Sequence, residues 1–168
     1  SSSSAASDVY KRQIVNNTVE RGGIILIPVL AVGRAQEVMI ILEKLIRAKQ
    51  IPQIPIYTDG MIQEATAITS CHPEFLSKGV RDRIFHVGQN PFLAEAFQQV
   101  TSNEERELIV QGDPCIIMAT SGMLSGGPSV NYFKTLCNNP NNSMIFVSYQ
   151  GKGTLGSKIQ KGITEVQF

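Results

Sequence analysis

Small, hydroxyl-bearing and glycine residues occupy positions 120–129, directly after an apolar run at 115–119 and before a helical pattern at 130–137. A strand, a glycine- and serine-rich turn and a helix N-terminus, in this order, present unpaired backbone N–H groups and the positive end of a helix dipole. Such groups bind anions, most often phosphate. The pattern therefore predicts a phosphate-binding loop, although the need for glycine in a tight turn explains the same composition equally well.

Two further loops contain side chains suited to an anion. Arg34 follows Gly33 at the start of a helical pattern, where its guanidinium can bind two phosphate oxygens at once. The alternative is a pair with Glu37 on the same helix, which stabilises an exposed helix by only about 0.3–0.5 kcal/mol. Thr154 follows Gly153 and either caps a helix or contacts a ligand. Both alternatives stay open for each residue.

The other ionisable residues do not form a catalytic set. Asp59, before Gly60, is interpreted as a turn residue or a helix cap, with catalysis as a minor alternative. His72 and His86 lack a partner at the spacing of a metal site, and His86 is interpreted as a structural residue of a strand. The Walker and G-x-S-x-G hydrolase motifs do not occur, and a dinucleotide-binding site is poorly supported. The residues therefore predict anion binding without a catalytic or metal-binding residue.

These loops need a scaffold that brings them together. Short apolar runs typical of buried strands alternate with helical patterns, which predicts an α/β fold with a mainly parallel sheet and helices on both faces. The strands are expected at residues 24–29, 54–57, 83–87, 115–119 and 143–148. Ligands of such sheets bind beyond the carboxyl ends of the strands. Four connecting loops are therefore expected along one edge, namely residues 30–34, 59–60, 120–128 and 149–154.

The composition indicates one globular domain without a strong charge bias. The 168 residues are 42% hydrophobic with a net charge of +1, so a site for a polyanion would have to be local. Three unpatterned cysteines, Cys71, Cys115 and Cys137, predict reduced thiols in a cytoplasmic protein. The apolar runs are too short to span a membrane. Residues 1–13 are expected to be a disordered tail or an artefact of cloning or sequencing, which leaves residues 14–168 as the domain.

Three segments resemble one protein family; they are residues 23–37, 118–127 and 148–156. They are similar to the β-CASP domain of metallo-β-lactamase-fold ribonucleases, and in particular to archaeal proteins related to the cleavage and polyadenylation specificity factor. The most specific matches are G-R-A-Q-E at 33–37 and S-G-M-x-x-G-G at 121–127. The resemblance covers residues 14–168, with Leu30 standing where the family more often has Phe.

The resemblance implies a Rossmann-like β-CASP domain that is a fragment of a zinc-dependent ribonuclease acting in RNA 3′-end processing or decay. The domain would bind the RNA backbone and close over the metal site of a metallo-β-lactamase domain in the same parent chain. Two zinc ions are expected there and none in this fragment, and a homodimeric parent is a further expectation. The implied phosphate-binding residues are Arg34, Ser121, Gly122, Ser125, Gly126 and Thr154.

The metal-binding motifs of that family, H-x-H-x-D-H and S-G-H, do not occur in these 168 residues. We therefore expect this domain by itself not to hydrolyse RNA. Without the resemblance, the alternative is a non-catalytic Rossmann-like module that binds a nucleotide or another phosphate ligand.

Overall fold

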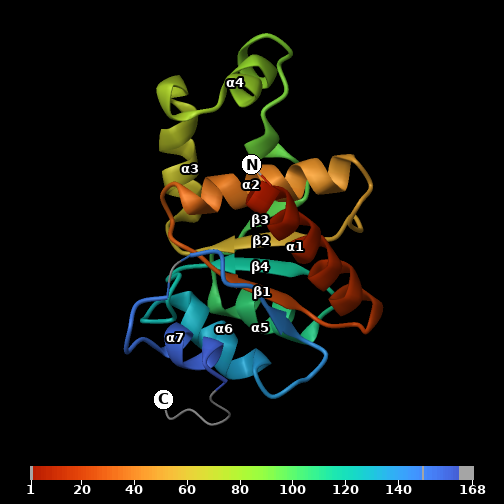
Figure 1. The fold of residues 1–168 in the computed structure, drawn as a ribbon, viewed down its shortest axis with the longest axis vertical. Helices are drawn as coiled ribbons and strands as arrows, with labels where there is room; N and C mark the ends of the chain where they lie inside the picture. Colours follow the sequence, from red (N-terminus) through yellow and green to blue (C-terminus); the bar gives the residue numbers. More distant parts are fainter. Residues whose placement is uncertain (1, 149, 163–168) are drawn as a thin grey trace.

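The computed structural model describes residues 2–148 and 150–162, with side chains from residue 8 onward. These residues form a three-layer α/β fold with helices on both sides of a central sheet (Figure 1). The sheet has five strands in the order β3-β2-β4-β1-β5, and every described pairing is parallel. The predicted fold class is therefore confirmed.

The elements alternate along most of the chain. The strands are β1 (Ile25–Pro28), β2 (Ile56–Asp59), β3 (Phe97–Gln99), β4 (Ile116–Ala119) and β5 (Ser143–Met144). The α-helices are α1 (Ser2–Glu20), α2 (Arg34–Arg47), α3 (Ile62–Ser70), α4 (Lys78–Phe85), α5 (Asn103–Gln111), α6 (Pro128–Leu136) and α7 (Leu155–Gln160). Two 3-10 turns, η1 (Pro73–Phe75) and η2 (Pro91–Leu93), flank α4 in sequence.

The central strands are buried on both faces, which explains their nearly continuous apolar sequences. Ile25 and Ile27 of β1 belong to a core shared with α1, α2, α3 and α4. Leu26, between them, belongs to a second core with α5 and α6 on the opposite face. Figure 1 shows the same division, with α2 and α3 above the sheet and α5 and α6 below it.

The carboxyl ends of three strands lie side by side. Pro28 of β1 and Asp59 of β2 are both in register with Ala119 of β4, so the loops after these strands leave the same edge, as predicted. β1 and β2 continue into α2 and α3 on one face, whereas β4 continues into α6 on the other. Connections that diverge in this way open a crevice at the edge of the sheet, where α/β folds bind ligands.

The strand predicted at residues 83–87 is wrong, because these residues end the helix α4 and the turn after it. Ser77 caps this helix by accepting a hydrogen bond from the backbone N–H of Val80 at 3.4 Å. His86 therefore follows a helix, with its side chain exposed and 3.8 Å from Asp82. The actual third strand is β3, which the sequence concealed because only one of its three residues is apolar.

Residues 2–13 are helical and form the first turns of α1, which differs from the disordered tail predicted for residues 1–13. The second half of α1 is anchored by the buried side chains of Val15 and Thr18. No glycine or proline interrupts the segment before Gly22, so a helix nucleated at this anchor can extend toward the N-terminus. α1 thus continues without a break across the predicted domain boundary between residues 13 and 14, and that boundary stays a prediction.

The C-terminal elements follow the prediction in part. Only the first two residues of the strand predicted at 143–148 pair in the sheet, although Ile145 and Val147 are buried. The helix α7 lies where it was predicted, and the extended piece predicted at residues 164–168 falls outside the described residues. None of the helices in the described part of the chain combines the length and hydropathy needed to cross a membrane.

Candidate functional site

The loop between β4 and α6, residues 120–127, is closed by its own hydroxyl and backbone groups. The hydroxyl of Ser121 accepts a hydrogen bond from the N–H of Ser125 at 3.0 Å, and the Ser121 N–H donates to the Gly126 carbonyl at 3.1 Å. Ser129 of α6 donates its hydroxyl to the Ser121 carbonyl at 2.7 Å. The two predicted serines, Ser121 and Ser125, therefore shape the loop and do not both point outward.

Glycine is required where this loop turns into α6. Gly127 has a φ of +74°, and a Cβ at this position would lie 2.9 Å from the carbonyl oxygen of Thr120. The steric explanation for the glycines therefore holds at Gly127. A Cβ at Gly126, in contrast, would meet nothing within 4 Å.

The second half of the loop is open to solvent. Ser125, Gly126 and Gly127 are exposed, and the N–H groups of both glycines donate to no atom of the described residues. They lead directly into Pro128, the first residue of α6. These N–H groups, at the positive end of the helix dipole, form the part of the loop that is suited to an anion.

Arg34, at the start of α2, is already engaged by two acceptors. Its Nη1 donates to Glu37 at 2.8 Å, and its Nε donates to the carbonyl oxygen of Val147 beyond β5. The pair with Glu37 that the sequence left open is thus present. The side chain is still 47% exposed, and a guanidinium has five N–H donors, so further hydrogens remain for a ligand.

Thr154 caps α7, as one of its two alternatives predicted. Its hydroxyl accepts from the N–H of Ser157 at 3.3 Å and donates to the Gly151 carbonyl at 2.6 Å. The N–H of Gly156, in the first turn of α7, donates to the Met123 carbonyl at 3.1 Å. The cap therefore lies beside the loop after β4.

The structure brings the six predicted phosphate-binding residues to one edge of the sheet. Four of them share the loop after β4, and Thr154 sits on the segment docked against that loop. A Cβ at Gly122 would lie 3.1 Å from the backbone nitrogen of Leu30, so the same loop also packs against the connection that leads to Arg34. Their role as phosphate ligands stays a prediction.

Asp59 forms a buried cluster that the sequence did not predict. Its carboxylate is 1% exposed and receives two hydrogen bonds from Arg106 of α5, at 2.7 and 2.9 Å. The hydroxyl of Tyr132, on α6, donates to it at 2.6 Å, and the N–H of Gly60 donates at 2.8 Å. The cluster therefore joins the end of β2 to two helices of the opposite layer. The hydrogen bond from the Gly60 N–H agrees with the interpretation of Asp59 as a turn residue. The bonds from Arg106 and Tyr132 were not predicted.

The hydrogen bonds determine how these groups ionise. Burial disfavours a charged Asp59, but the bonds from Arg106 and Tyr132 outweigh it and hold the pKa of Asp59 below its usual range. Burial, together with the bond to that carboxylate, raises the pKa of Tyr132. The cluster is thus an ion pair with a neutral phenol, and its satisfied carboxylate is not available as a general base.

The fold and the loop edge agree with the comparison to known families. The Beta-Casp domain model matches residues 35–159. The chain is a β-CASP domain. Proteins named transcription termination factor FttA are similar to it over nearly its whole length, with 53% identity in Methanosarcina mazei, 54% in Lokiarchaeum and 56% in Methanothermobacter thermautotrophicus.

The matches to these three relatives cover 95%, 96% and 90% of the chain but only 25%, 26% and 24% of the relatives. The β-CASP domain described here thus spans about a quarter of the length of the curated relatives it matches. The resemblance recognised in the sequence is confirmed at the level of the family.

The described residues of this β-CASP domain do not fit a zinc centre. Among them, no three His, Cys, Asp or Glu side chains gather closely enough to hold a metal ion. His72 lies 3.1 Å from Glu74 near η1, away from the candidate edge. The three cysteines are unpaired, and burial raises the pKa of Cys115 to about 12, which makes this thiol a poor ligand at neutral pH.

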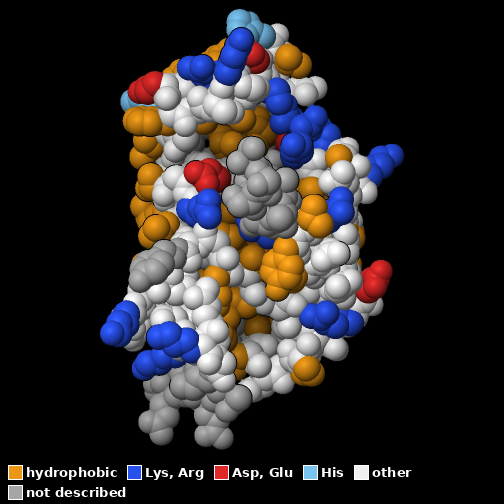
Figure 2. Space-filling model, in the orientation of Figure 1, with side chains coloured by type: hydrophobic (Ala, Val, Ile, Leu, Met, Phe, Trp, Pro, Cys, Tyr) orange, Lys and Arg blue, Asp and Glu red, His pale blue; other side chains and the backbone are white. Residues whose placement is uncertain are grey.

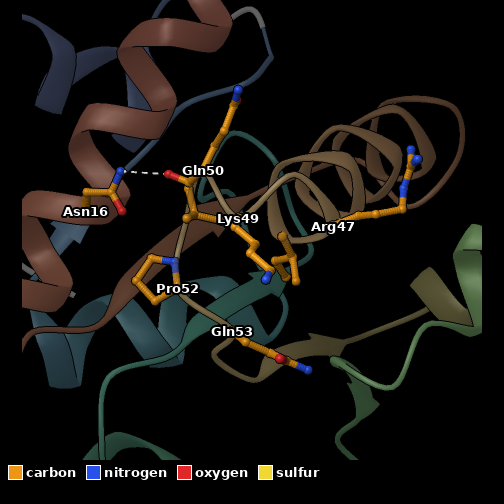
Figure 3. A pocket seen from close by; sticks show the side chains of 8 residues that line it. Asn16, Arg47, Lys49, Gln50, Pro52 and Gln53 are labelled. Carbon is orange, nitrogen blue, oxygen red and sulfur yellow. Dashed lines mark hydrogen bonds between the residues drawn. The ribbon is translucent and has the colours of Figure 1, made fainter.

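The larger described cavities lie outside the candidate edge. An apolar groove of about 850 Å³ runs between α2 and α3, and the exposed hydrophobic side chains along the upper left of Figure 2 follow it. It shares Val32 and Gly33 with the connection after β1 but contains none of the six predicted residues. A second cavity, of about 700 Å³, is lined by Asn16, Arg47 and the segment before β2 (Figure 3). This cavity lies at the opposite edge of the sheet.

Proposed function

We propose that this β-CASP domain grips the RNA backbone within a larger nucleic-acid-processing protein of the transcription termination factor type. The observation that carries the proposal is sequence identity above 50% to three such factors over at least 90% of the chain. The chemistry of the candidate edge supports it, because the exposed groups there are donors and a cation suited to phosphate.

The proposed grip consists of backbone N–H groups and one guanidinium. Gly126 and Gly127 offer N–H groups at the start of α6, and Arg34 offers the remaining hydrogens of its guanidinium. None of these groups reads a base, so contacts of this kind position RNA and do not select its sequence. We therefore propose binding to the backbone of single-stranded RNA without strong sequence preference.

Hydrolysis of RNA is assigned in this proposal to the parent protein. The domain would close over a metallo-β-lactamase domain in the rest of the parent chain, where two zinc ions are proposed to activate water. A homodimeric parent, a cytoplasmic location and a role in RNA 3′-end processing or decay belong to the same proposal. The described residues contribute binding and closure and no catalytic group.

Fluorescence anisotropy of the 168-residue chain with a labelled single-stranded RNA of about 20 nucleotides tests this proposal. The affinity should fall as salt rises from 50 to 200 mM, because each neutralised phosphate releases counterions, with a slope of about 0.7 per contact on a log–log plot. A labelled nucleotide serves as the comparison. Binding of the nucleotide without binding of RNA would overturn the proposal and favour the small-ligand module.

A further inference from the structure

Gln150 joins the segment before α7 to the loop after β4. Its side chain is only 6% exposed, and its Nε2 donates to the carbonyl oxygens of Gly122 and Ser148, both at 2.9 Å. The two hydrogens of the amide nitrogen are therefore both used. Gly122 lies 28 residues away in sequence, so this side chain provides a long-range connection within the candidate edge.

The other end of the same amide is placed against α7. Its Oε1 is buried without a hydrogen-bond partner among the described residues, a state that proteins rarely tolerate without a reason. A Cβ on Gly156 would lie 1.8 Å from this oxygen, so a larger residue at this position would force the Gln150 amide to move. The Gly156 N–H donates to the Met123 carbonyl, and the Gln150 amide donates to the Gly122 carbonyl. The segment that contains Gln150 and Gly156 thus binds two consecutive carbonyls of the loop after β4.

The loop after β4 thus has a fixed half and an open half. Gly122 is packed between Gln150 and the connection after β1, and Leu124 is buried. The following residues, Gly126 and Gly127, are exposed and have N–H groups without a described partner. Because the first half of the loop is fixed, the second half has fewer orientations available. Less conformational entropy of the loop is then lost when a ligand binds.

We propose that Gln150 is a positioning residue for RNA binding, and that Gly156 is required because it makes room for the Gln150 amide. This inference rests on the proposed function of the edge. Gln150 is proposed to act through the loop and not by contacting phosphate itself. It holds the carbonyl of Gly122 so that the N–H groups of Gly126 and Gly127 stay directed outward.

The test compares Gln150→Met with Gln111→Met in the 168-residue chain. Methionine keeps the length of the side chain and removes both donors, and Gln111 is an exposed residue at the end of α5. We expect Gln150→Met to weaken RNA binding about tenfold, equivalent to about 1.4 kcal/mol, with the salt slope of the wild type because no phosphate contact is removed. Gln111→Met should bind as the wild type does.

Amide exchange measured by NMR separates positioning from a general loss of stability. In Gln150→Met, exchange of the hydrogen-bonded N–H groups of Ser121 and Ser125 should accelerate while exchange in β1 and β4 stays unchanged. Faster loop exchange in a chain whose wild type binds no RNA would overturn the proposed function yet support Gln150 as the residue that holds the loop. Unchanged exchange together with unchanged RNA affinity would overturn the inference.

A double-mutant cycle tests the pairing with Gly156. Gly156→Ala should weaken RNA binding to a similar extent, because the new methyl group displaces the Gln150 amide. In a Gln150→Ala background the methyl group no longer meets that amide and keeps only a 3.1 Å contact to the Met123 carbonyl oxygen, so the second substitution should cost less than it does in the wild type. Additive losses would show that the two residues act separately and would contradict the pairing.

Discussion

At the scale of single residues, the candidate edge contains groups that are partly used by the fold itself. Arg34 is the clearest case, since it donates both to Glu37 of its own helix and to the carbonyl of Val147. Thr154 is similar, because its hydroxyl caps α7. Arg34 can therefore contribute to a site only through the guanidinium hydrogens that its internal bonds leave unused, whereas the one hydroxyl hydrogen of Thr154 is already donated to the Gly151 carbonyl.

Arg34→Ala should reduce the affinity for single-stranded RNA about ten- to a hundredfold, because a charge-assisted contact to phosphate is worth about 1.5–3 kcal/mol. The salt slope should also become shallower, since one phosphate contact is lost. Titrations followed by anisotropy at two or more salt concentrations measure both effects.

Arg47→Ala is the matched control for this substitution. Arg47 also lies on α2 and also pairs with a glutamate, Glu43, at 3.3 Å, but it lines the cavity at the opposite edge. The Arg47→Ala variant should bind RNA with the affinity of the wild type. Coincident titrations of Arg34→Ala and the wild type would exclude Arg34 as a phosphate ligand.

At the scale of elements, the Asp59 cluster fixes the position of α5 and α6 relative to the end of β2. A carboxylate and a phenol are removed from water there, Arg106 stays 33% exposed, and the carboxylate oxygens accept from Arg106, Tyr132 and the Gly60 N–H. Breaking one bond of such a cluster leaves a buried group without its partner.

Tyr132→Phe should lower the free energy of unfolding by about 1–3 kcal/mol, because it removes one donor from the buried carboxylate and leaves the ring in place. Urea denaturation followed by circular dichroism measures this change. Tyr10→Phe, at an exposed position of α1, should leave the midpoint where it is. Equal midpoints for the wild type and Tyr132→Phe would show that the hydroxyl contributes nothing to stability.

The same cluster predicts a loss of stability in acid. The pKa of Asp59 is lowered in the folded protein, so the unfolded chain takes up a proton at this residue first as the pH falls. Its stabilisation is therefore present above the unfolded pKa of about 3.9 and is lost as the pH falls through the folded value. Urea midpoints of the wild type between pH 5 and pH 3 should decline more steeply than those of Asp59→Asn, and parallel curves would contradict this assignment.

At the scale of the whole molecule, the edge proposed to bind RNA lies in a domain whose described residues contain no metal-binding cluster. It spans about a quarter of the relatives that it matches, so the activity proposed for the parent requires the rest of that chain. An apolar groove of about 850 Å³ between α2 and α3 lies outside this edge.

Incubation of the 168-residue chain with zinc and end-labelled RNA should yield no cleavage products on a denaturing gel, because the described residues cannot assemble a zinc centre. The same samples should still show the mobility shift of bound RNA. Cleavage that a chelator abolishes would contradict the assignment of hydrolysis to the parent protein.

The sequence alone determined the fold class, the strands β1, β2 and β4, the edge at which their loops meet and the family. These features depend on local patterns, namely apolar runs, helical spacing and glycine-rich turns, which residues close in sequence encode. The strand predicted at residues 83–87 failed for the same reason, since a local pattern could not show that a capped helix forms there.

The tertiary structure alone decided which side chains meet at the candidate edge. Arg34 and Val147 are separated by 113 residues, Asp59 and Tyr132 by 73, and Gln150 and Gly122 by 28. Strand order and the two helical layers bring such residues together, and no local periodicity records that order. The sequence therefore located the edge and the loop predicted to bind an anion, whereas the contacts that hold the loop in shape follow from packing across the sheet.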